Sequence, residues 1–155
     1  MCDKEINIRV AMSSDCSEVY AWRSDPISVS MFCSASIPSY EEHKDWFNSS
    51  LNSAERTLYI GQMGSIKIGV CRFDRNSRRG SAEVSINMNP ACRGKGLGKK
   101  FLELSIEHFR HANRDDLTAK IKPENEASLK IFKSCGFQEI SSKENVIVLE
   151  RCPKN

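Results

Sequence analysis

The sequence predicts an α/β fold, with one domain built on a mixed, mostly antiparallel central sheet. Three observations lead to this class. The 155 residues, 39% of them hydrophobic and 28% charged, suit one globular domain over residues 1–155. Strand-like and helix-like runs follow one another in the order β-α-α-β-β-β-α-β-α-β-β. We find no internal repeat, low-complexity segment or linker that would divide the chain.

The first elements are predicted to be a strand, a helix and an irregular stretch. Residues 6–10 alternate apolar and polar side chains, as a half-buried strand does. Residues 13–15, Ser-Ser-Asp, offer N-cap side chains for a helix that runs to about residue 23. Asp25-Pro26 ends this helix, and residues 27–38 are expected to be irregular.

A second helix and three antiparallel strands are predicted next. Ser39 can cap the helix, and Glu42 completes a capping box. The strand-rich runs that follow are separated by Met63-Gly64-Ser65 and by a basic turn at residues 75–80, which indicates consecutive hairpins. The predicted strands span residues 56–62, 66–73 and 81–89.

The last part of the chain is predicted to alternate helices and strands. Pro90 stops the third of these strands, and residues 97–112 have the apolar spacing of an amphipathic helix. Gly136 ends a shorter helix in the usual C-terminal position. The remaining elements are a strand at 117–121, that helix at 126–135, and a hairpin of strands at 137–140 and 146–149.

Composition and charge exclude several classes of protein. No run approaches the roughly 18 apolar residues of a membrane span, and the charged N-terminus lacks a signal peptide, so we expect a cytoplasmic protein without a membrane partner. The seven cysteines form no CxxC pair, which predicts reduced thiols and no metal site. The basic turn at residues 75–80 has no interleaved aromatics, so we expect no nucleic-acid partner. The net charge is only +3, but Arg93, Lys95, Lys99 and Lys100 lie within eight positions, which favours a polyanionic ligand.

The most distinctive segment is Arg93-Gly94-Lys95-Gly96-Leu97-Gly98, between a strand and a long helix. Such a corner aims free backbone N–H groups and the positive end of a helix at one point, which favours phosphate. Glycines let a pyrophosphate approach the backbone and permit a positive φ. The spacing fits neither a P-loop nor the GxGxxG of dinucleotide-binding folds. The alternative is a plain strand-to-helix corner.

With Arg93, Gly96 and Gly98, this loop resembles the coenzyme A motif of the GNAT family of N-acetyltransferases. The stretch from Asn125 to Phe137 is similar to that family's next turn and helix, and the element order agrees over nearly the whole chain. The resemblance implies acetyl-CoA as co-substrate. The residues implied to bind it are Met88, Arg93, Gly94, Lys95, Gly96, Leu97, Gly98, Lys99, Asn125, Ser128 and Phe132. Asn125 is equally a helix cap, and both roles can hold together.

The resemblance also implies the catalytic groups. The strand before the loop is expected to carry a bulge and to splay from its neighbour, so that acetyl-pantetheine lies between them. The N–H near Met88 then faces the thioester oxygen, and Glu83 acts as base through water. The alternative for Glu83 is a solvent-facing residue or a partner of Arg72 across the hairpin.

The sequence departs from the family at the leaving-group acid, because Phe132 stands where a tyrosine is frequent. A thiol has a pKa of about 8.5, so a thiolate can leave near neutral pH with little help. Cys135 is three residues on, and we interpret it as a buried helix-end thiol rather than a substitute acid.

Substrate choice is expected at the N-terminal helices. The pattern Trp22-Arg23-x-x-Pro26, followed by Glu41-Glu42-His43-x-x-Trp46-Phe47, resembles the GNAT branch that acetylates the 4-amino group of nucleotide-linked amino-deoxy sugars, as in pseudaminic acid synthesis. This resemblance implies that Arg23 binds a diphosphate and that Met31 and Trp46 flank a base or sugar. It also implies that His43 contacts the substrate or relays a proton. Alternatively, the aromatic residues are core and His43 is exposed.

Two other functions stay open: a protein N-terminal or lysine acetyltransferase, and a non-catalytic acyl-CoA-binding module. The expected partners are acetyl-CoA and a small amine, with a homodimer left open.

Overall fold

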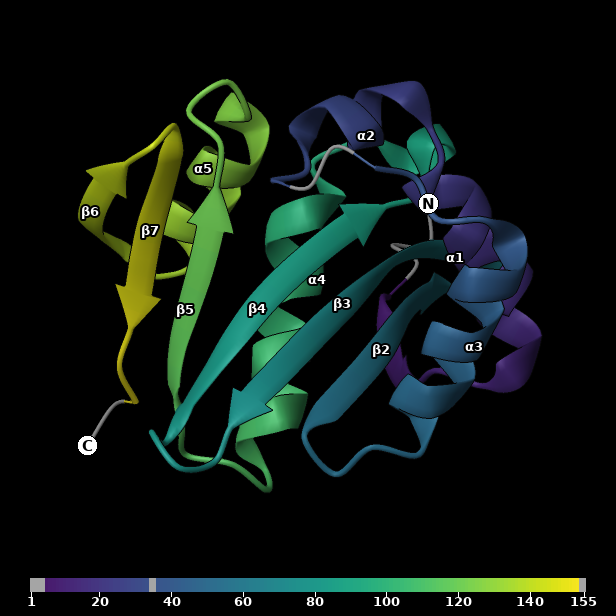
Figure 1. Ribbon diagram of the computed structural model, residues 1–155, viewed down its shortest axis with the longest axis horizontal. Coiled ribbons are helices and arrows are strands. Elements are labelled where there is room, and N and C mark those ends of the chain that lie inside the picture. Colours follow the sequence, from purple (N-terminus) through teal and green to yellow (C-terminus); the bar gives the residue numbers. More distant parts are fainter. Residues whose placement is uncertain (1–4, 34–35, 154–155) are drawn as a thin grey trace.

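The computed structural model describes residues 5–33 and 36–153, and these form one α/β domain around a seven-stranded sheet of order β1-β2-β3-β4-β5-β7-β6 (Figure 1). Among the strand pairs described, only β4–β5 is parallel, so the predicted mixed, mostly antiparallel sheet is confirmed. No helix among the described residues is long and apolar enough to cross a membrane. The strands are β1 (Asn7–Val10), β2 (Arg56–Met63), β3 (Ile66–Asn76), β4 (Ser81–Met88), β5 (Asp116–Ile121), β6 (Gln138–Lys143) and β7 (Val146–Arg151). The helices are α1 (Cys16–Arg23), α2 (Pro26–Met31), α3 (Tyr40–Leu51), α4 (Leu97–Arg110) and α5 (Glu126–Ser134).

The region expected to be irregular contains a helix that sequence reasoning missed. Pro26 was interpreted only as the end of α1, but it is also the first residue of α2. Proline suits this position because its fixed φ matches a helix and its missing N–H would be unpaired there anyway. The Asp25 carboxylate caps α2 by accepting from the N–H groups of Ile27 and Ser28, each at 3.2 Å.

The predicted start of α1 also needs correction. Residues 13–15 form a separate 3₁₀ turn, and the Asp15 carboxylate accepts from the N–H of Met12 instead of capping α1. This buried carboxylate also pairs with Arg9 and Lys67, both at 2.8 Å. Burial alone would raise the pKa of Asp15, but the hydrogen bonds from Arg9, Lys67 and Met12 outweigh it and lower the pKa.

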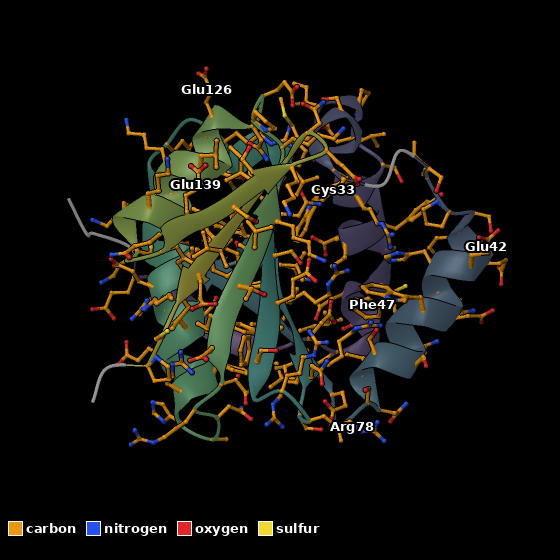
Figure 2. All side chains as sticks on the ribbon, turned by 60° about the vertical axis from the view of Figure 1, so that its left-hand side comes forward. Cys33, Glu42, Phe47, Arg78, Glu126 and Glu139 are labelled. Atoms are coloured by element: carbon orange, nitrogen blue, oxygen red, sulfur yellow. The ribbon has the colours of Figure 1, made fainter. Side chains whose placement is uncertain are left out.

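Helices cover both faces of the sheet. The helices α4 and α5 lie behind it in Figure 1, where Phe73 of β3 stacks on Phe109 of α4 with ring centroids 4.2 Å apart. The other face is covered by α1 and α3, and Ser39 caps α3 by accepting from the N–H of Glu42, as predicted. Figure 2 shows Phe47 on the inner side of α3 and Glu42 on its outer side.

The sheet opens between β4 and β5. These strands pair only from Ser81–Asp116 to Glu83–Thr118, and beyond that they diverge (Figure 1). The expected splay is therefore confirmed. The expected bulge in β4 is not found, because the register with β3 is continuous from Gly69–Met88 to Asn76–Ser81. The divergence of β5 alone opens the sheet.

Candidate active site

A cavity of about 1110 Å³ occupies the splay between β4 and β5. It extends from the glycine loop and α5 to α1, α2 and Trp46 of α3. The structure thus brings together fourteen of the residues singled out from sequence: Arg23, Met31, Trp46, Glu83, Met88, Arg93, Gly94, Gly96, Leu97, Gly98, Lys99, Asn125, Ser128 and Phe132. Lys95 and His43 do not line it.

The glycine loop has the backbone that its sequence predicts. Gly94 and Gly96 adopt φ of 72° and 71°, a region that side-chain-bearing residues rarely occupy, and α4 begins at Leu97. The first N–H groups of α4 have no partner within the helix, so they are available to an anion. Lys95 is exposed and does not line the cavity.

Gly98 has a packing role besides the cofactor role expected from the sequence. It lines the cavity and is also buried between helices. A Cβ added at Gly98 would lie 2.5 Å from Cδ1 of Ile131, well inside van der Waals contact. Gly98 therefore allows α4 and α5 to approach closely at the cofactor end of the cavity.

The start of α5 also lines the cavity, next to the start of α4. The Asn125 side chain caps it by accepting from the N–H of Ser128 at 3.2 Å, so the capping interpretation is confirmed. Phe132 is 2% exposed and packs edge-on against Phe137. Cys135 is buried, does not line this cavity, and has a pKa raised by burial, as expected of a structural thiol.

The backbone of β4 presents donors to the open side of the splay. The N–H of Asn89 bonds to the carbonyl of Ile68, on the β3 side, at 2.9 Å. Successive N–H groups of a strand point to opposite edges, so the N–H of Met88 points away from β3. β5 has already diverged at this level, since its last pairing with β4 is at Glu83. The Met88 N–H is thus directed into the cavity.

Glu83 lies where the splay begins. Its carboxylate is 4.0 Å from the ammonium of Lys120 on β5. Arg72, the alternative partner from sequence, instead pairs with Asp74 at 3.0 Å. Among the described residues that line the cavity, Glu83 is the sole carboxylate. It is therefore the acidic side chain placed to accept a proton inside the cavity.

Arginines gather around one aromatic ring at the other end of the cavity. The guanidinium groups of Arg23, Arg56 and Arg72 lie 5.3, 5.3 and 5.6 Å from the Trp46 ring centroid. Asp74 pairs with both Arg56 and Arg72, whereas Arg23 has no carboxylate partner among the described residues. Burial, followed by the nearby charge of Arg72, lowers the pKa of Arg23. This cluster carries an excess of positive charge where the cavity is lined by Arg23 and Arg72.

His43 is not part of the cavity, contrary to both sequence interpretations. It is 1% exposed and packs among Tyr20, Trp46 and Phe47. Its Nε2 lies 3.3 Å from the carbonyl oxygen of Cys16, and burial lowers its pKa. His43 faces inward because it is one helical turn from Phe47 on the buried side of α3. Its ring lies 5.7 Å from that of Trp46, measured between ring centroids.

Sequence reasoning missed three cations of the cavity: Arg72, Lys120 and Lys130. Arg72 and Lys120 come from strands, where alternation shows that two residues share a face but not which cavity the face meets. Together with Arg23, Arg93 and Lys99, they make the cavity strongly cationic. A ligand with several negative charges is favoured along its length.

The chain was compared with known proteins. The model of the Acetyltransferase (GNAT) domain matches residues 5–138. The YwnH protein of Bacillus subtilis, whose provisional name is phosphinothricin acetyltransferase, is 29% identical over 140 residues, which are 86% of this chain and 85% of that protein. An L-methionine sulfoximine/L-methionine sulfone acetyltransferase of Salmonella typhimurium is 37% identical over 59 residues, 38% of this chain and 34% of its own.

Solved structures share the fold. A domain from Methanocaldococcus jannaschii has a TM-score of 0.81 at 23% identity, covering 97% of this chain and 99% of that domain. Spermidine N-acetyltransferase from Vibrio cholerae, in complex with CoA and spermine, has a TM-score of 0.81 at 16% identity, covering 96% and 94%. The chain belongs to the GNAT acetyltransferase family and is an acetyl-CoA-dependent N-acetyltransferase.

Proposed function

We propose that the chain, as one domain over residues 1–155, transfers acetyl directly from acetyl-CoA to an anion-bearing amine in the splayed cavity. The arm of the cofactor lies between β4 and β5, with its phosphates at the glycine loop and the start of α4. The residues proposed to contact the cofactor are Met88, Gly94, Gly96, Leu97, Gly98, Lys99, Asn125, Ser128 and Phe132. The Arg93 side chain lines the same cavity but is bonded to Asp25 and Ser28, and Lys95 supplies long-range positive charge from outside the cavity. Cytoplasmic location and a homodimer stay predictions.

The Met88 N–H supports the chemical step. A donor fixed in the backbone and aimed at the thioester oxygen stabilises the negative charge that develops when the amine attacks. Because β3 holds Met88 in register with Gly69, this donor needs no rearrangement during the reaction.

Glu83 is proposed as the base, acting through water. An amine must lose a proton as it attacks, and Glu83 is the described carboxylate of the cavity. The ammonium of Lys120 on β5 lies 4.0 Å from this carboxylate. No side-chain acid is assigned to the leaving thiolate: Phe132 cannot donate a proton, and Cys135 lies outside the cavity.

The acceptor is proposed to be a nucleotide-linked 4-amino-deoxy sugar, as the resemblance implies. The observation that carries this proposal is the partly buried guanidinium of Arg23, which lies beside Arg72 and Trp46 and has no carboxylate partner among the residues that the structure describes. Two guanidinium groups suit a diphosphate, and the flat Trp46 ring suits a base or sugar, with Met31 also lining the cavity. A polyamine, by contrast, would be repelled by these cations.

A second candidate is an amino acid, because its carboxylate would satisfy Arg23 equally well. The Salmonella relative acts, by its name, on L-methionine sulfoximine and sulfone. A peptide N-terminus or lysine would bring a long chain into a cavity with no acidic groove among its described residues. A module without catalysis would have no use for a donor at Met88 and a carboxylate at Glu83.

Steady-state kinetics with four acceptors test this proposal: a UDP-linked 4-amino sugar, L-methionine sulfone, a peptide with a free N-terminus, and spermidine. We expect the sugar to have the highest kcat/KM. Arg23→Ala should raise its KM about tenfold to hundredfold, which corresponds to one lost charge-assisted contact, with the KM for acetyl-CoA unchanged.

Arg78→Ala is the matched control, because Arg78 is exposed in the basic turn and lies at the opposite end of the molecule from Cys33 of the cavity (Figure 2). Faster acetylation of methionine sulfone would favour the amino-acid candidate, and faster acetylation of spermidine would contradict an anionic acceptor altogether.

A further inference from the structure

The helix α2 forms one wall of the acceptor end of the cavity. Four of its six residues, Ile27, Ser28, Val29 and Met31, line the cavity. Six residues are too few for a helix to be stable alone. The position of this wall therefore depends on the contacts that hold the start of α2.

Those contacts come from the cofactor loop. The Nη1 atom of Arg93 lies 2.9 Å from Oδ2 of Asp25, the same oxygen that caps α2. The Nη2 atom of Arg93 donates to the hydroxyl of Ser28, and this hydroxyl donates to Oδ1 of Asn87 on β4 at 3.2 Å. Ser28 is 4% exposed. One guanidinium thus joins the glycine loop, the first turn of α2 and the end of β4.

This arrangement does not suit Arg93 as a phosphate ligand. Two of its nitrogens are already bonded to α2, and the paired Arg93 lowers the pKa of the Asp25 carboxyl. A phosphate would have to compete with the capping carboxylate, and its success would leave Asp25 unpaired and α2 less well held.

We propose that Arg93 is a positioning residue that ties α2 to the cofactor loop, so that acetyl-CoA at the loop and acceptor against α2 bind with positive coupling. The role of α2 as acceptor wall rests on the proposed function. The tie itself rests on the contacts above. When the cofactor orders the loop, it orders α2 through Arg93, and less ordering is left for the acceptor to supply.

Asp25→Asn isolates the tie. Asparagine caps helices as well as aspartate does, so the start of α2 keeps its cap while the ion pair with Arg93 is lost. Asp45→Asn is the matched control, because Asp45 is exposed on α3 and forms no ion pair among the described residues.

The experiment is amide hydrogen exchange of residues 27–31 with and without CoA, together with calorimetric titration of CoA. In the wild-type chain and in Asp45→Asn, CoA should slow exchange in α2 by about fivefold or more, the lower range of typical site-to-site coupling. In Asp25→Asn, CoA should bind with its Kd unchanged, but the slowing should disappear.

Three results would overturn the inference. In the wild-type chain, CoA could leave the rate of amide exchange in α2 unchanged. In Asp25→Asn, CoA could still slow this exchange, or it could bind with a lower Kd than in the wild-type chain. The last would mean that Asp25 competes with phosphate for Arg93. If the wild-type chain does not bind CoA at all, the proposed cofactor site fails as well. With an acceptor in hand, Asp25→Asn should raise the acceptor KM at saturating acetyl-CoA and, because the coupling is reciprocal, the KM for acetyl-CoA at saturating acceptor, with kcat unchanged.

Discussion

Replacing Gly96 by alanine tests the proposed cofactor loop most directly. Gly96 has φ of 71°, and an added Cβ would meet no heavy atom within 4 Å. The substitution therefore causes no clash but costs about 1–2 kcal/mol, because an L-residue must adopt a left-handed conformation. Gly80, in the turn between β3 and β4, has φ of 62° and equally open surroundings, but it does not line the cavity. Gly80→Ala is thus a control with the same backbone strain.

Thermal melts with and without acetyl-CoA separate strain from binding. At a concentration about 100 times Kd, acetyl-CoA should stabilise the wild-type chain by about 2.7 kcal/mol. At about 2–4 °C per kcal/mol for a chain of this size, the Tm should rise by about 5–11 °C. If the methyl group at Gly96 weakens binding about tenfold, only about 1.4 kcal/mol remains at the same concentration, so the shift should fall to about half.

Both variants should therefore melt earlier than the wild-type chain without ligand, but Gly96→Ala alone should lose part of the acetyl-CoA shift. An undiminished shift in Gly96→Ala would place the pyrophosphate elsewhere. A shift reduced equally in Gly80→Ala would show that the assay reports general destabilisation rather than contact at the loop.

Three further predictions concern other parts of the chain. Glu83→Gln should lower kcat about a hundredfold at pH 7, and least at high pH where the amine is already neutral; full activity at pH 7 would leave bulk solvent as the base. Gly98→Ala should lower the free energy of unfolding by about 1–3 kcal/mol, because the added methyl group overpacks against Ile131. Ile131→Val removes Cδ1, so the double variant should recover most of this loss when unfolding is measured by urea titration. The pKa of His43 is lowered in the folded chain, so between pH 6.5 and that lower pKa the unfolded chain binds more protons than the folded chain, and Tm should fall as the pH drops below 6.5. His43→Phe should make Tm less dependent on pH in this range. If Tm depends on pH as steeply in His43→Phe as in the wild-type chain, other groups cause the dependence.

Much of the fold follows from local signals in the sequence. Alternation and turn residues predicted the hairpins of β2, β3 and β4, and the strand-to-helix corner at the glycine loop placed the start of α4. The helix α2 was missed because proline both ends and begins helices, and only the Asp25 cap distinguishes the two. The missing bulge in β4 was an expectation taken from the family rather than from any residue.

The candidate site was predictable where backbone chemistry dictates the residue, as at Gly94 and Gly96. It was less predictable where tertiary packing decides. His43 has a type that suits a ligand site, yet it packs against Phe47 in the interior, and Gly98 lines the cavity but is also required for close packing against Ile131. The sequence does not predict the cationic surroundings of Arg23, because Arg72 comes from β3 and lies near Arg23 only in the folded chain.

The opening between β4 and β5 divides the sheet into two hydrogen-bonded blocks, β1–β4 and β5–β7. Three residue pairs join the blocks directly. On the face covered by α4 and α5, α4 lies against the first block, where Gly69 lets Phe101 approach the strands, and α5 meets α4 at Gly98. The two blocks are therefore hydrogen-bonded to each other at one end of the sheet only. A cofactor arm lying between β4 and β5 at the open end would contact both blocks, so its binding would reduce the motion of one block relative to the other, including strands that it does not contact.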